Sequence, residues 1–177
     1  MNADTPLYSA ILDSPVGPLT VIASDAGVRA VLWPGDDPSR IREIAATPDP
    51  DHPVLRVAVE QLDEYFDGGR QDFDLPLDPV GTEFQRSAWE TLRTIGYGST
   101  ISYGEQAARM GDRRKARAVG AANGRNPISI IVPCHRVVGA SGALTGFAGG
   151  VETKAWLLDH ERDVIASGRR PENAASS

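Results

Sequence analysis

The sequence has very little cysteine and histidine: one cysteine and three histidines among 177 residues. A single cysteine excludes an internal disulfide, and the histidines at positions 52, 135 and 160 are too far apart in sequence for a four-ligand zinc site. No apolar run is long enough to cross a bilayer, and the first residues lack the basic and apolar stretches of a signal peptide. We therefore expect a soluble cytoplasmic protein with no metal, no cofactor and no membrane partner.

Charge is unevenly distributed along the chain. The net charge is −6, but residues 1–80 hold 15 acidic and 5 basic side chains, whereas residues 81–177 hold 9 and 13. Six of the basic residues lie between positions 109 and 125: Arg109, Arg113, Arg114, Lys115, Arg117 and Arg125. Such a cluster indicates either a polyanionic partner such as nucleic acid or an ordinary solvated helix face, and composition alone leaves both open.

The first half of the chain is predicted to form a small antiparallel sheet followed by a helix. Three segments of strand composition lie close together between turn sequences: residues 8–12, 19–23 and 28–33. A short helix is expected over 39–46 and a longer amphipathic helix over 54–66. The prolines of segment 73–79 make it an extended linker, so we expect a domain boundary near residue 80.

The second half is predicted to be mostly helical. Four helices are expected: residues 82–95, 103–110, 113–123 and 153–161. The middle two are joined by a tight glycine-containing turn and the second carries basic residues, which is typical of a helix-turn-helix but also of other helical pairs. A strand is expected to lead from Pro127 to Cys134, a hairpin over 137–146 to act as a wing, and the chain from residue 166 to be disordered.

The only thiol lies in an apolar run and is followed at once by His135 and Arg136. Free cysteine has a pKa near 8.5, and a neighbouring imidazole or guanidinium raises the fraction of reactive thiolate. A lone cysteine is also commonly an inert core residue. Residues 130–138 by themselves therefore leave a reactive and a structural Cys134 equally open.

Four linked motifs frame this cysteine: Asn126-Pro127, Pro133-Cys134-His135-Arg136-Val137, Thr145-Gly146-Phe147-Ala148-Gly149-Gly150, and Lys154-Ala155-Trp156-Leu157-Leu158 with Glu161 after it. In this order and spacing the chain resembles the O6-alkylguanine-DNA alkyltransferases, also called methylated-DNA–protein-cysteine methyltransferases, closely over residues 80–162 and loosely before them. The resemblance implies an α+β fold of two domains. An N-terminal antiparallel sheet with helices, ribonuclease H-like, is expected over 1–79. A mostly helical winged helix-turn-helix domain carrying the reactive cysteine is expected over 80–165, before a disordered tail over 166–177.

The activity implied by this resemblance is direct reversal of DNA damage. An alkyl group on guanine O6 in duplex DNA would pass to Cys134 after the damaged nucleotide is flipped out, and the thioether product would make the transfer irreversible and single-turnover. Resemblance assigns His135 to accept the thiol proton through a water and Glu161 to orient His135. It assigns Asn126 to brace the active-site turn. It assigns Tyr103 to rotate the target phosphate and to donate a proton.

The resemblance also implies DNA and base contacts. Arg117 corresponds to the finger that replaces the flipped base in the stack, on a helix that enters the minor groove. The DNA-contacting set is Arg117, Tyr103, Ala116, Ala118, Gly120, Ala121 and Asn123, whose small members would equally suit tight helix packing. The base pocket is Val137, Phe147, Ala148 and Gly149. Phe147 stands where the family often has tyrosine, which predicts a pocket that favours larger, apolar alkyl groups.

Other functions compete with this interpretation. A lesion-binding relative without repair activity would lack the reactive cysteine, and a cysteine hydrolase would not need the basic helix pair. A sequence-reading regulator would carry more Gln, Asn and Ser on the second helix, where Asn123 is the exception. Each polar site residue taken singly also fits an ordinary structural role. We expect a monomer whose partner is double-stranded DNA containing O6-alkylguanine, with O4-alkylthymine repair and cooperative DNA binding left open.

Overall fold

The computed structural model describes residues 5–36 and 45–168. Its larger sheet has four strands: β1 (Tyr8–Leu12), β2 (Leu19–Ser24), β3 (Gly27–Leu32) and β4 (Thr47–Pro48). The strand order is β3-β2-β1-β4, with β1 and β3 antiparallel to β2 and the short edge strand β4 parallel to β1. The predicted antiparallel meander is confirmed. β4 was not predicted, because its two residues lie in a proline-rich segment without strand periodicity.

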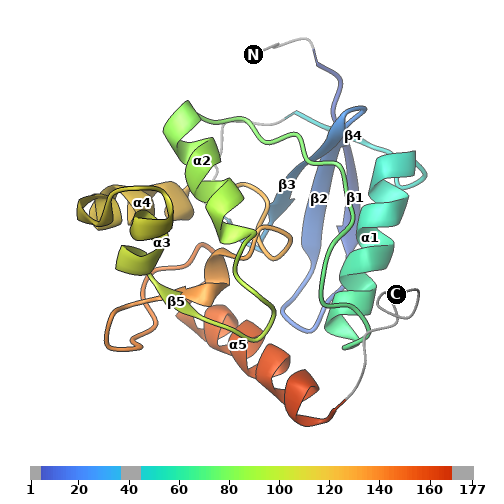
Figure 1. The fold of residues 1–177 in the computed structure, drawn as a ribbon. Helices are drawn as coiled ribbons and strands as arrows, with labels where there is room; N and C mark the ends of the chain where they lie inside the picture. Colours follow the sequence, from blue (N-terminus) through green and yellow to red (C-terminus); the bar gives the residue numbers. More distant parts are fainter. Residues whose placement is uncertain (1–4, 37–44, 169–177) are drawn as a thin grey trace.

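Helix α1 (Pro53–Phe66) covers one side of this sheet (Figure 1). It begins where the His52 side chain accepts a hydrogen bond from the amide of Val54, and Pro53 suits the first turn because its nitrogen needs no partner there. Its buried face carries Leu55, Ala58, Leu62 and Tyr65 at helical spacing. The short helix expected over 39–46 falls mostly outside the described residues, and positions 45 and 46 are not helical.

The rest of the described chain is mainly helical, with one small two-stranded sheet. The elements are α2 (Glu83–Leu92), β5 (Ile101–Ser102), α3 (Tyr103–Arg109), the 3₁₀ turn η1 (Arg113–Lys115), α4 (Ala116–Gly124), the 3₁₀ turn η2 (Cys134–Arg136), β6 (Val137–Val138) and α5 (Val151–Ala166). A reciprocal capping box between Thr82 and Gln85 starts α2, as the sequence predicted for Thr82. The tight connection between α3 and α4 forms the expected helix-turn-helix.

Two predictions about the segment around Cys134 were wrong. Residues 127–133 form no regular strand, only isolated bridges at Ile128, Ser129 and Val132. The hairpin expected over 137–146 is absent from the described residues, because β6 pairs in parallel with β5 while Gly139 and Ala143 close a tight turn. Prolines at 127 and 133 remove ladder donors, so this segment is an irregular loop.

A single apolar core joins the sheet, α1 and the C-terminal helices. It includes Val21 and Leu62 from the first part of the chain together with Leu92, Val132 and Leu157 from the second. α5 starts two residues earlier and ends five residues later than predicted, and residues 169–177 of the expected tail lie outside the described part. Within that part, no helix is both long and apolar enough to cross a membrane.

Candidate active site

Cys134 is presented by a loop that Asn126 ties together. The Asn126 Nδ2 group donates to the carbonyl of Val132 at 2.9 Å, and its Oδ1 accepts from the amide of Ile128 at 3.0 Å. Within this loop Ile130 has φ 73°, a left-handed conformation that is costly for a β-branched residue. Such strain persists only where the surroundings impose it, so the loop is held rigidly up to the buried Cys134.

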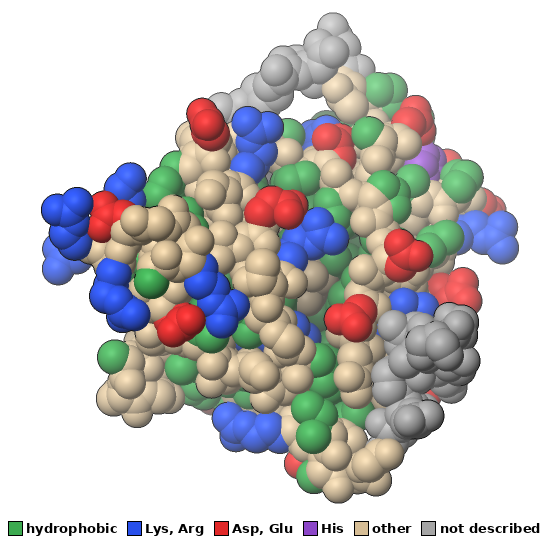
Figure 2. Space-filling view, viewed as in Figure 1, with side chains coloured by type: hydrophobic (Ala, Val, Ile, Leu, Met, Phe, Trp, Pro, Cys, Tyr) green, Lys and Arg blue, Asp and Glu red, His purple; other side chains and the backbone are tan. Residues whose placement is uncertain are grey.

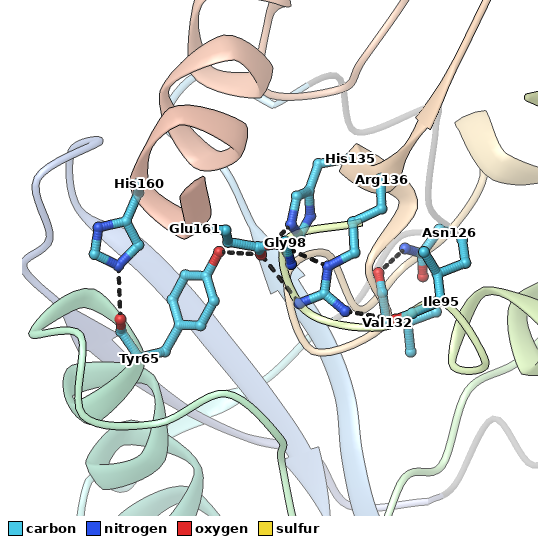
Figure 3. A network of polar contacts seen from close by, with 9 residues as sticks. All are labelled: Tyr65, Ile95, Gly98, Asn126, Val132, His135, Arg136, His160 and Glu161. Carbon is cyan, nitrogen blue, oxygen red and sulfur yellow. Dashed lines mark hydrogen bonds and ion pairs between the residues drawn. The ribbon is translucent and has the colours of Figure 1, made fainter. Parts of the chain in front are cut away.

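Behind the thiol, the carboxylate of Glu161 is the centre of a buried polar network (Figure 3). Its Oε2 accepts from the Tyr65 hydroxyl at 2.7 Å, from His135 Nε2 at 2.7 Å and from Arg136 Nη2 at 3.0 Å. Its Oε1 accepts from Arg136 Nε and from the Gly98 amide, each at 2.9 Å. Arg136 also donates through Nη1 to the carbonyl of Ile95 at 2.8 Å. The carboxylate lone pairs are therefore fully used.

The network fixes the protonation of His135. Burial alone would raise the pKa of Glu161, but contacts with His135 and with the permanently charged Arg136 hold it well below the usual 4.5, so the carboxylate is ionised. Burial lowers the pKa of His135, against the opposing pull of Glu161, so the resting imidazole is neutral. Since Nε2 must then carry the proton donated to Glu161, Nδ1 is left as an acceptor, and it is buried with no hydrogen-bond partner among the residues that the structure describes.

A narrow pocket opens in front of Cys134. Its lining comes from α3, α4, the active-site loop and the segment after β6: Tyr103, Asn123, Gly124, Asn126, Ser129, Cys134, Gly146, Phe147 and Ala148. The Tyr103 hydroxyl, at the start of α3, lies 2.8 Å from Thr145 Oγ1. Of the residues predicted for the pocket, Phe147 and Ala148 line it. Val137 is instead buried in β6, and Gly149 packs so closely on Trp33 that an added Cβ would lie 2.7 Å from the indole.

Lys154 is a site residue that the sequence analysis did not assign. It is 1% exposed on α5, donates through Nζ to the carbonyl of Thr145 at 3.2 Å and lies 6.0 Å from the ring centre of Tyr103. Burial lowers the pKa of Lys154, and the charge of a Cys134 thiolate opposes this shift. The same interaction favours the thiolate of Cys134.

The N-terminal sheet also supports the pocket. Trp33, just after β3, donates through Nε1 to Ser129 Oγ at 3.2 Å and packs edge-on against Phe147 with ring centres 5.4 Å apart. The amide of Val31 donates to the carbonyl of Pro127 at 2.8 Å. Both walls of the pocket therefore rest on β3.

The helix pair α3–α4 presents a basic, small-residue surface. Figure 2 shows Lys and Arg side chains gathered at the edge of the molecule formed by α3 and α4. Arg117, Ala118 and Ala121 are exposed there, and Ala116 and Gly120 are partly exposed. Asn123 is buried and exchanges two hydrogen bonds with Gln106, at 2.7 and 3.0 Å, that hold α4 to α3. It also lies in the lining of the pocket in front of Cys134.

Among the predicted catalytic residues, the structure brings His135 and Glu161 into contact and places Cys134, Asn126 and Tyr103 around one pocket. Arg117 lies on the exposed basic surface. The sequence analysis missed contributors that come from several elements: Trp33, Tyr65, Gly98, Ser129 and Lys154. Lys154 did leave a signal, since it shares the apolar stripe of α5 with Leu157, Leu158 and Glu161, where an uncompensated charge would be costly.

The fold and site define a DNA-binding helix-turn-helix unit built around a buried free thiol. Family models bear this out: residues 83–163 match the model described as 6-O-methylguanine DNA methyltransferase, DNA binding domain, and residues 7–79 match 6-O-methylguanine DNA methyltransferase, ribonuclease-like domain. The chain belongs to this family.

Individual members of this family are similar to the chain over most of its length. A methylated-DNA–protein-cysteine methyltransferase of Methanosarcina acetivorans is 44% identical over 158 residues, which cover 88% of this chain and 98% of the relative. One from Mycobacterium bovis is 49% identical over 158 residues, 88% of this chain and 93% of the relative. The crystal structure of Mycobacterium tuberculosis OGT in complex with DNA superimposes with a TM-score of 0.82 at 44% identity, covering 93% of this chain and 95% of that one.

Proposed function

We propose that this chain repairs DNA directly, as a methylated-DNA–[protein]-cysteine S-methyltransferase. It transfers a methyl or other alkyl group from guanine O6 in double-stranded DNA to Cys134, once per chain. Family membership supports the reaction class. The observation that carries the mechanism is the 2.7 Å contact of His135 Nε2 with Glu161 Oε2, because it leaves Nδ1 of the residue directly after the cysteine without a partner among the described residues.

In the proposed reaction, the Cys134 thiol gives its proton to His135 Nδ1 through a water. The imidazolium that forms is stabilised by the ionised Glu161, which already accepts from Nε2. The thiolate then attacks the alkyl carbon, forming the S–C bond as the C–O bond breaks. The electron pair of the broken bond stays with guanine, whose negative charge a proton from Tyr103 neutralises. Lys154 favours the thiolate, and Asn126 holds the loop that aims it.

Residues 80–165 form the proposed DNA-binding and alkyl-acceptor unit. Guanine O6 is inaccessible inside a duplex, so the nucleotide must be turned out of the stack at a cost of a few kcal/mol. Arg117 is exposed on α4 and fills the gap that the extruded nucleotide leaves in the base stack. The small exposed residues Ala118 and Ala121 allow the helix to approach the minor groove closely. Asn123 contributes by joining α3 to α4.

The test uses the full chain and a duplex with one O6-methylguanine. Intact-protein and peptide masses should show one added CH₂ unit per chain, located on Cys134, and no turnover beyond one lesion per protein. Cys134→Ser should leave the lesion intact. A lesion that persists while the protein binds it would indicate a damage binder, repeated turnover would indicate a hydrolytic or cyclic enzyme, and binding that ignores the lesion would indicate a sequence-reading regulator.

We further propose a cytoplasmic location. A single acceptor thiol works only while it is reduced, and reducing compartments keep thiols in that state. Monobromobimane labelling of Cys134 in freshly lysed cells would show the thiol reduced, whereas a mixed disulfide at Cys134 would contradict this location.

A further inference from the structure

A residue of the N-terminal segment reaches the catalytic carboxylate. Tyr65, in the last turn of α1, donates its hydroxyl proton to Glu161 Oε2 at 2.7 Å, across 96 positions of sequence. This is as short as the contact from His135 Nε2 to the same oxygen. Figure 3 shows the tyrosine and the histidine approaching Glu161 from different elements. The carboxylate that orients His135 is therefore held jointly by α1 and η2.

Tyr65 makes a second contact with the adjoining residue of α5. Its backbone carbonyl accepts from His160 Nε2 at 2.8 Å, and His160 stacks on Trp156 with ring centres 4.9 Å apart. The Tyr65 ring is completely buried and packs near Phe66 and Phe73. One residue of α1 thus binds two consecutive residues of α5, which leaves the hydroxyl little freedom to turn away from Glu161.

The Tyr65 hydroxyl changes how strongly Glu161 stabilises the protonated form of His135. Donation to Oε2 withdraws electron density from the oxygen that also accepts from His135, and so weakens its stabilisation of an imidazolium. The titratable and charged groups that face this carboxylate are Tyr65 from α1, Tyr97 from the loop before β5, and His135 and Arg136 from η2. On α5 itself, Lys154 acts on His135. Of these, Tyr65 and the resting His135 are neutral donors to the carboxylate, and Tyr65 is the one that comes from α1.

We propose that Tyr65 is a positioning residue for alkyl transfer: through its hydroxyl, the N-terminal segment holds Glu161 in the orientation that His135 requires and keeps the resting imidazole neutral. This inference rests on the proposed function. It gives the N-terminal segment a part in the chemistry besides its support of the pocket walls.

The test compares Tyr65→Phe with two matched controls. Tyr97→Phe removes a second buried hydroxyl of the same aromatic cluster and keeps the ring; within the described part of the chain this hydroxyl has no hydrogen-bond partner. Phe73→Leu disturbs the packing around Tyr65 without touching the carboxylate. For each variant, thermal unfolding and the second-order rate of methyl transfer from an O6-methylguanine duplex are measured from pH 5 to pH 9.

Tyr65→Phe should slow transfer about fivefold, the equivalent of one neutral hydrogen bond. The acidic limb of its pH–rate profile, where the rate falls because His135 is protonated, should move to higher pH. A more basic carboxylate keeps the imidazolium protonated up to a higher pH. Tyr97→Phe should leave the acidic limb at its wild-type pH and the transfer rate within about twofold of the wild type. Phe73→Leu should leave the acidic limb in place even if it lowers the thermal stability. Should Tyr65→Phe not fold, 3-fluorotyrosine placed at position 65 strengthens the donor and should move the limb to lower pH.

The outcomes separate the two proposals. A wild-type protein that leaves Cys134 unmethylated overturns the proposed function itself. If the wild type is active but Tyr65→Phe keeps its rate and limb, or 3-fluorotyrosine leaves the limb in place, the role of Tyr65 is overturned. An equal slowing by Tyr65→Phe and Phe73→Leu with no movement of the limb would likewise overturn it, by showing that Tyr65 only packs.

Discussion

His135 and Glu161 are joined by a 2.7 Å contact between Nε2 and Oε2, and both side chains are completely buried. A buried carboxylate is costly unless it is paired, and this one is compensated by Arg136 and by further donors on both oxygens. The pair can therefore remain as ionised Glu161 and neutral His135 until the thiol proton arrives.

Acid should destabilise the fold in two steps. Burial lowers the pKa of His135 below 6.5. The contacts of Glu161 with His135 and Arg136 hold the pKa of this carboxyl below 4.5. In both cases the unfolded chain binds more protons than the folded chain, so the stabilisation is complete above these values and declines as the pH falls below them. Urea unfolding from pH 8 to pH 3 should show both declines. Glu161→Gln should lose about 3–5 kcal/mol by leaving Arg136 uncompensated, and should lack the lower step.

Lys154→Met should slow alkyl transfer about tenfold at pH 7 while retaining the apolar stem of the side chain. The buried ammonium interacts with the charge of Cys134, so its loss disfavours the thiolate. The rate should recover as the pH is raised above 9, where the thiol ionises unaided. A rate loss that is the same at every pH would show that Lys154 acts through packing alone.

Arg117→Ala should slow repair of a duplex lesion about tenfold or more and leave the reaction with free O6-benzylguanine within about twofold, because only the duplex requires extrusion of a base. Arg56→Ala is a matched control, since it removes an exposed arginine from α1. Equal slowing of Arg117→Ala on both substrates would exclude a finger role.

Asn123→Ala should destabilise the protein by about 1–3 kcal/mol, because it leaves the buried Gln106 Oε1 without the donor that it accepts from. Adding Gln106→Leu should restore part of the loss, since both polar groups are then absent. Chemical unfolding measures both effects. If Asn123→Ala leaves the stability unchanged but weakens DNA binding, Asn123 contacts DNA and does not mainly join the two helices.

Phe147→Tyr should shift the pocket towards small alkyl groups. Phe147 lines the pocket and packs edge-on against Trp33, so its ring edge is part of an apolar wall. A hydroxyl added there makes the wall polar, and the ratio of the O6-benzylguanine rate to the O6-methylguanine rate should fall about threefold. A wild-type protein that already prefers methyl would contradict the predicted preference for larger groups.

Much of the fold and site could be predicted from local pattern. Strand composition and turns located β1 to β3, and the cap at Thr82 and the stripes of α1 and α5 located helices. The motif around Cys134 identified His135 and Glu161 as a pair. Failures occurred where the backbone is irregular, as between Pro127 and Pro133, because an apolar run has the same composition in a strand and in a buried loop.

The chemical groups that are available can be read from the sequence: one thiol, an imidazole beside it, a carboxylate on the buried stripe of α5 and a basic helix pair. The partners of these groups depend on the tertiary structure. It joined Asn123 to Gln106, placed the buried Lys154 against Thr145 and Tyr103, and carried Tyr65 from α1 to Glu161. Periodicity indicates which face of a helix is buried, but the neighbour that covers that face depends on how distant segments pack, and those contacts leave no local pattern.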